Sequence, residues 1–119
     1  MDPVTTLHTL LHVVEHAERW RIGDHAIKQF AANAVRISFL LPDQDTALFV
    51  KWARHLDDEQ ITGFAAGPIG HLHVRGRILS GHTIEVSVLH EGQWLRSAGL
   101  VGPLELGEVE QAARKAVAA

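Results

Sequence analysis

Apolar side chains recur at three- and four-residue spacing in three segments of the chain, and this periodicity predicts three helices. The segments are residues 4–20, residues 45–57 and residues 107–118. The last has acidic residues at its start and basic residues at its end, an order that suits the helix dipole. In the first, the spacing gathers one apolar face, which we expect to pack on the core: Leu7, Leu10, Leu11, Val14 and Ala17.

Residues 45–57 are also compatible with a strand, and the topology of the sheet depends on whether this segment is a helix or a strand. A strand here would pair back on residues 34–41, and its tightest register would set Arg36 opposite Lys51. Like charges in that arrangement are unfavourable. A helix instead has Asp43 or Asp45 as its N-cap. We therefore predict a helix whose core side consists of Leu48, Phe49, Trp52 and Leu56.

Two further elements are predicted between the first and second helices. Asp24 can cap a short helix that runs to about Ala32, because the apolar residues after Asp24 share helical spacing. Residues 34–41 alternate between apolar and polar side chains and are rich in β-formers, so we predict a strand that ends at Pro42. Its core-facing residues are Val35, Ile37, Phe39 and Leu41.

Residues 71–79 and 82–90 predict a β-hairpin whose register follows from parity. The main apolar residues of both arms carry even numbers, and facing residues of a hairpin have numbers with a constant sum. That sum must be even, which excludes a two-residue loop and favours a three-residue loop with Gly81 in the left-handed conformation. The predicted pairs are Leu72 with Val88, Val74 with Val86, His73 with Ser87 and Arg75 with Glu85.

The remaining segments complete the predicted fold. Residues 60–66 predict a short strand, and residues 91–106 predict a loop with at most one short strand, because glycine and proline interrupt that segment repeatedly. We predict a single compact α+β domain over residues 1–119. Its sheet is small and mostly antiparallel, includes the hairpin of residues 71–90, and is packed by N-terminal, central and C-terminal helices.

The composition excludes several kinds of site. The 119 residues include no cysteine and no tyrosine, so thiol nucleophiles, disulfides and cysteine-based zinc or iron–sulfur sites are ruled out. A net charge of −3 does not suit broad contact with nucleic-acid phosphates. No apolar run approaches the roughly 20 residues of a membrane helix and no secretory signal is visible, so we expect a cytoplasmic protein. The excess of arginine over lysine suggests a GC-rich, bacterial genome.

Nine histidines are the unusual feature of the composition. His8, His12 and His16 recur every fourth residue on the first predicted helix and form a stripe opposite its leucine face. Neighbouring members could share a divalent metal ion, which would make this a histidine-based metal-binding protein. The alternative is a solvated polar face, which we favour because the sequence fixes no further ligand nearby. No cofactor is expected.

A second histidine group continues into two arginines on the first hairpin arm. His71, His73, Arg75 and Arg77 share one face of that strand and form the most concentrated positive patch of the sequence. This row could bind an anion or a nucleic acid, or act as a pH-sensitive surface. The alternative, which we favour, is a polar outer face of the sheet in which Arg75 pairs with Glu85.

Trp20 and Trp94 are the candidate partner-binding residues, because Trp20 lies off the main apolar face and Trp94 lies in the interrupted segment. Alternatively, both side chains close off the core. No motif for nucleophilic catalysis or phosphate binding is found in the sequence. We therefore favour a non-enzymatic interaction or assembly domain that forms a homo-oligomer or binds another protein. The alternatives are a nucleic-acid-binding accessory or regulatory protein that uses residues 71–77, and the metal-binding protein described above.

Overall fold

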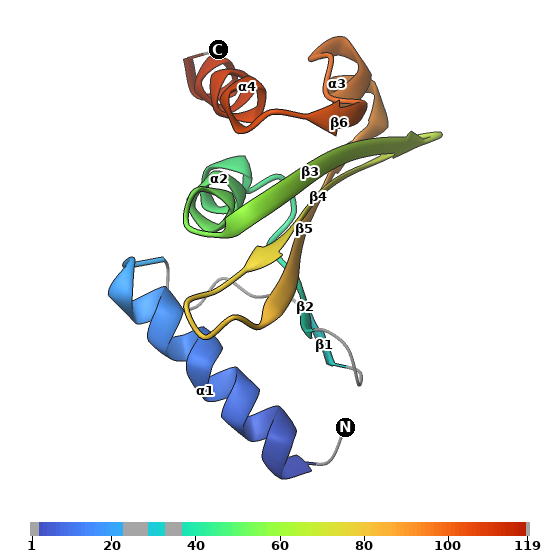
Figure 1. The fold of residues 1–119 in the computed structure, drawn as a ribbon. Helices are drawn as coiled ribbons and strands as arrows, with labels where there is room; N and C mark the ends of the chain where they lie inside the picture. The colour runs from blue at the N-terminus through green and yellow to red at the C-terminus, as the bar shows by residue number, and fades with distance from the viewer. Residues whose placement is uncertain (1–2, 23–28, 33–36, 119) are drawn as a thin grey trace.

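A mixed sheet covered by helices organises the computed structural model, which describes residues 3–22, 29–32 and 37–118 (Figure 1). In chain order the described elements are α1 (Pro3–Arg19), β1 (Gln29–Ala32), β2 (Ile37–Leu40), α2 (Thr46–Arg54), β3 (Asp57–Ala66), β4 (Ile69–Arg77), β5 (Thr83–Glu91), α3 (Gly92–Ser97), β6 (Gly102–Leu104) and α4 (Leu106–Ala118). The strand order is β1-β2-β5-β4-β3-β6, in which β2 and β5 run parallel and the other neighbouring pairs run antiparallel. The predicted α+β class with a mostly antiparallel sheet is confirmed.

The hairpin of β4 and β5 has the predicted register. Leu72 lies opposite Val88, Val74 opposite Val86, His73 opposite Ser87 and Arg75 opposite Glu85. The Ile78 N–H donates to the His82 carbonyl at 3.0 Å, which closes a three-residue loop. Gly81 has a φ of 88° in this loop, the left-handed conformation that a bulged hairpin turn requires.

The core lies between one face of the sheet and the helices that cover it. The inward side chains of β4 and β5 are fully buried: Leu72, Val74, Val86 and Val88. Helix α2 contributes its predicted core side, on which Phe49 and Trp52 are buried. The Asp45 side chain accepts a hydrogen bond from the Leu48 N–H at 3.1 Å, as expected of an N-cap. The prediction of a helix rather than a strand is therefore confirmed for residues 46–54, although the helix ends earlier than expected and Asp57 already begins β3.

The segment before β2 differs from the sequence-based expectation. Residues 29–32 form strand β1 and not the end of a short helix, because they pair with β2, with Phe30 opposite Phe39. Pairing with a neighbouring strand outweighs a weak local preference for helix. The beginning of the predicted helix at Asp24 lies outside the described residues, as does Val35 of the predicted strand.

Residues 91–106 contain the helix α3 as well as the short strand β6, so the prediction of a loop is wrong for residues 92–97. Leu95 is fully buried, and Gly92 packs so closely on the β3–β4 turn that a Cβ there would lie 2.4 Å from the Gly67 carbonyl oxygen. A helix of six residues offers too few apolar positions for periodicity to reveal it. Tertiary packing therefore decides the conformation of this segment.

Helix α1 has the predicted extent but not the predicted orientation. The residues that point inward are Thr9, Val13 and His16, each at most 5% exposed. Three of the expected core residues point outward instead, with exposed fractions of 64% for Leu7, 55% for Leu11 and 50% for Val14. Only Leu10 and Ala17 of the predicted face pack against the core. Periodicity shows that a helix has an apolar face, but it does not show whether that face packs on the core of the same chain.

Candidate interaction surface

Helix α1 docks on the β4–β5 turn through His16. The His16 side chain is 2% exposed, its Nδ1 accepts a hydrogen bond from the Leu79 N–H at 3.4 Å, and its ring stacks on Trp52. Because Nδ1 accepts, the proton of the neutral ring is on Nε2, which has no hydrogen-bond partner among the described residues. Burial lowers the pKa of His16, and the charge of Asp57 offsets only part of this effect.

Two further ring contacts hold α1 in place. His12 stacks on His82 beside the β4–β5 turn, with ring centroids 5.4 Å apart. Trp20, just after α1, stacks on His55 at the end of α2, with centroids 4.4 Å apart. The predicted partner-binding residue Trp20 therefore contributes to the docking of α1 and keeps 39% of its surface exposed.

The side of α1 that faces away from the core also carries apolar side chains. We define the α1 outer face as Leu7, Leu11, Val14 and Glu18, which follow one another at four- and three-residue spacing. Its three apolar side chains are at least 50% exposed and extend over two turns of the helix. A contiguous exposed apolar stripe of this kind is typical of a surface that contacts another molecule.

The three histidines of the predicted metal site do not converge. His8 and His12 are exposed, whereas His16 is buried on the docked side of α1. Four-residue spacing turns each successive histidine about 40° around the helix axis, so the stripe passes from solvent into the docking contact. Across the part of the chain that the structure describes, no three histidine, aspartate or glutamate side chains are grouped as metal ligands.

The row of His71, His73, Arg75 and Arg77 lies on the face of β4 opposite the core, with the histidines half-buried and the arginines exposed. Acidic neighbours compensate part of its charge, because His73 Nε2 lies 3.6 Å from Glu85 Oε1 and Arg77 forms an ion pair with Asp58. Burial lowers the pKa of His71, and the adjacent His73 adds to this effect. The row therefore presents less positive charge to a phosphate backbone than the sequence indicates.

Trp94 closes a small hollow that the sequence does not indicate. Its ring stacks on His90 with centroids 4.4 Å apart, and His90 Nε2 lies 2.8 Å from Thr46 Oγ1 in the first turn of α2. Burial lowers the pKa of His90. The hollow has a volume of about 190 Å³ and includes Gln44 and Glu91 in its lining. Because Thr46 and His90 come from distant elements, no local motif marks this contact.

Comparison with known proteins adds no assignment for this chain. It matches no family model, no curated protein and no solved structure. No helix within the described ranges is long and apolar enough to cross a membrane. An interpretation of function therefore rests on the surfaces and contacts described above. Among the described helices, α1 exposes the most apolar surface, on its outer face.

Proposed function

We propose that this chain is an assembly domain that forms a homodimer through the α1 outer face. The observation that carries the proposal is the orientation of α1. Its periodicity predicts that Leu7, Leu11 and Val14 are buried, yet a single chain leaves them 50–64% exposed. Most of the stability of a protein helix comes from burying its apolar face, and a second copy of the chain would complete that burial.

Polar side chains and the helix dipole favour an antiparallel pair of α1 helices. His8 lies toward the N-terminal end of the exposed side, whereas Glu15 and Glu18 lie toward its C-terminal end. A two-fold axis at Leu11 would bring His8 of one copy near Glu15 of the other and would set the two helix dipoles antiparallel. A parallel pair would instead place Glu18, which belongs to the outer face, against Glu18 of the other copy, and like charges repel. The antiparallel arrangement is therefore the one that we propose.

The apolar area on the outer face predicts a reversible dimer. Full burial of a leucine or valine side chain stabilises by about 1.5–3 kcal/mol, and the half-exposed side chains of the outer face can each supply about half of that. Part of this gain is offset by the lost translational and rotational freedom of the two copies. We therefore expect the fraction of dimer to depend on protein concentration.

The mass of the protein in solution tests this proposal. In analytical ultracentrifugation over a concentration series, we expect the mass to rise from that of the 13.1 kDa chain toward twice that value. Leu11→Asp places a carboxylate at the centre of the contact and should weaken association at least about tenfold. Val101→Asp is the matched control, because Val101 is 52% exposed and lies outside α1. A wild-type protein that stays monomeric throughout, or an equal effect of both substitutions, would refute the proposal.

A further inference from the structure

A groove lies between α2 and α4, on helices other than the one proposed to form the dimer. Its floor is apolar and consists of Ala47 and Val50 from α2 and Ala113 from α4. The two alanines leave the space open, because larger side chains at these positions would fill it. The groove has a volume of about 470 Å³, which is in the range of small-molecule binding sites.

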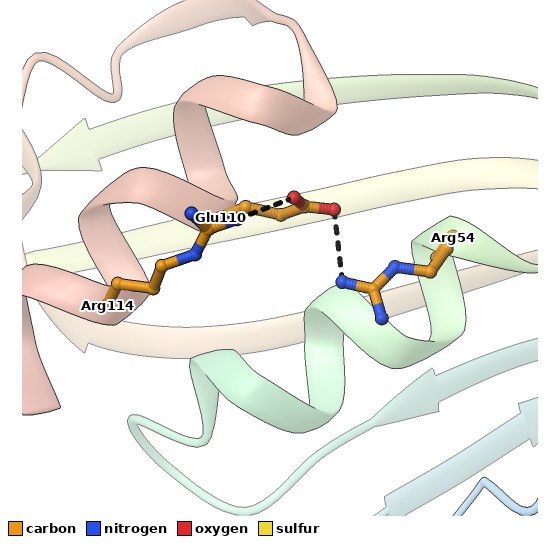
Figure 2. Close-up of polar contacts among 3 residues, drawn as sticks. All are labelled: Arg54, Glu110 and Arg114. Atoms are coloured by element: carbon orange, nitrogen blue, oxygen red, sulfur yellow. Dashed lines mark hydrogen bonds and ion pairs between the residues drawn. The ribbon is translucent and has the colours of Figure 1, made fainter.

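The rim of the groove carries three cationic side chains and one carboxylate. Arg54 from α2 and Arg114 from α4 both donate hydrogen bonds to Glu110, at 3.1 Å and 3.3 Å (Figure 2). Lys51 lies on the same side of α2 as Arg54. Three cations and one carboxylate give the lining a net charge of +2, whereas the whole chain has a net charge of −3. This local reversal of sign favours an anionic ligand.

We propose that the groove binds a medium-chain alkyl carboxylate, with the alkyl chain on the floor and the carboxylate at the rim. A water molecule occupies about 30 Å³ in the liquid, so a volume of about 470 Å³ has room for roughly 15 methylene-sized groups, enough for a chain of twelve carbons. A peptide helix is too large to be the ligand. It is about 10 Å across with its side chains, so the volume of the groove corresponds to little more than one helical turn. Guanidinium groups suit a carboxylate because they can offer two parallel hydrogen bonds.

Calorimetric titration with dodecanoate, below its micelle concentration, tests this assignment. We expect saturable binding at one site per chain with a Kd of about 100 µM or tighter. Ala47→Leu adds bulk to the floor at an exposed position and should weaken binding at least about tenfold. Lys51→Glu removes positive charge from the rim and should weaken binding in the same way. Ala116→Leu is the matched control, since it makes the same change at an exposed position of α4 outside the groove, and should leave the Kd unchanged.

Dodecyltrimethylammonium distinguishes recognition of the carboxylate from adsorption of any alkyl chain. It carries the same chain with the opposite charge, and we expect no saturable binding of it to the wild-type protein. Circular dichroism and thermal unfolding establish that each variant is folded before titration. Absence of dodecanoate binding, equal binding of the cationic compound, or an unchanged Kd in a folded Ala47→Leu variant would overturn the proposal. None of these outcomes depends on whether α1 forms a dimer.

Discussion

At the scale of single residues, the docking of α1 depends on a histidine that has to stay neutral. His16 is buried and accepts a hydrogen bond from the Leu79 N–H through Nδ1. The charges of His55 and Arg19 oppose protonation of His16 and that of Asp57 favours it, but burial is the largest effect and lowers its pKa. Protonation of Nδ1 would convert this acceptor into a donor and would break the bond to Leu79.

We predict that acidification destabilises the protein in part through His16. The unfolded chain restores the ordinary pKa of 6.5, so below that pH the unfolded state binds more protons than the folded state. The free energy of unfolding is therefore highest above the ordinary pKa of His16 and falls as the pH drops below it. Urea unfolding at about pH 7.5 and about pH 5.5 measures this loss. His16→Gln keeps a hydrogen-bond acceptor without a titrating ring and should lose less stability than the wild type.

His8→Gln is the control for this experiment, because His8 lies on the same helix and is exposed in the single chain. All variants are unfolded at a concentration low enough to keep the chain monomeric, so that the proposed contact of His8 with a second copy does not enter the comparison. It should lose as much stability on acidification as the wild type. Burial also lowers the pKa of His55, His71 and His90, so every variant should keep part of the acid sensitivity. An acid-induced loss of equal size in the wild type and in His16→Gln would show that His16 does not contribute.

At the scale of elements, Gly63 is the glycine whose replacement should destabilise the protein most, because another segment of backbone packs directly against it. Gly63 of β3 lies against the Leu100 carbonyl, and a Cβ at this position would be 1.6 Å from that oxygen. We expect Gly63→Ala to lower the free energy of unfolding by about 2–4 kcal/mol, measured by urea unfolding, because relief of the clash disturbs the pairing of β3 with β6.

Gly107→Ala is the matched control for Gly63→Ala. A Cβ at Gly107, in the first turn of α4, would meet nothing within 4 Å. Alanine is the better helix former, so we expect stability to stay unchanged or to rise by up to about 1 kcal/mol. Similar losses for the two variants would contradict the role of backbone packing at Gly63.

The elements that the sequence predicted correctly are those that local patterns determine. The register of β4 and β5 follows from the parity of apolar residues and the conformation of Gly81, both of which lie within the hairpin itself. The conformation of residues 29–32 depends on pairing with β2, and that of residues 92–97 depends on contacts with the β3–β4 turn. Neither contact is visible in the residues of the segment alone, and for that reason both predictions failed.

At the scale of the whole molecule, the described residues include two surfaces of unlike chemistry for which we propose partners. The α1 outer face is mainly apolar. Periodicity identified its apolar residues from the sequence, but it did not predict that they are exposed. The α2–α4 groove combines an apolar floor with a cationic rim. Its rim brings together Arg54 and Glu110, which are 56 residues apart, so only the packing of the two helices creates it. The two surfaces lie on different helices, and each proposal can therefore be tested without the other.

Cysteine cross-linking tests the proposed antiparallel pairing of α1 most directly, because the chain has no cysteine of its own. A two-fold axis at Leu11 places the two Leu11 sites together, whereas the two Leu7 sites would lie about 12 Å apart along the helices. Disulfide formation requires Cα atoms within about 7 Å. Under mild oxidation we therefore predict that Leu11→Cys forms a disulfide-linked dimer, and that Leu7→Cys and the surface control Val101→Cys do not. The pairing would be contradicted if Leu11→Cys formed cross-linked dimers no faster than Val101→Cys. It would also be contradicted if Leu7→Cys formed them as fast as Leu11→Cys.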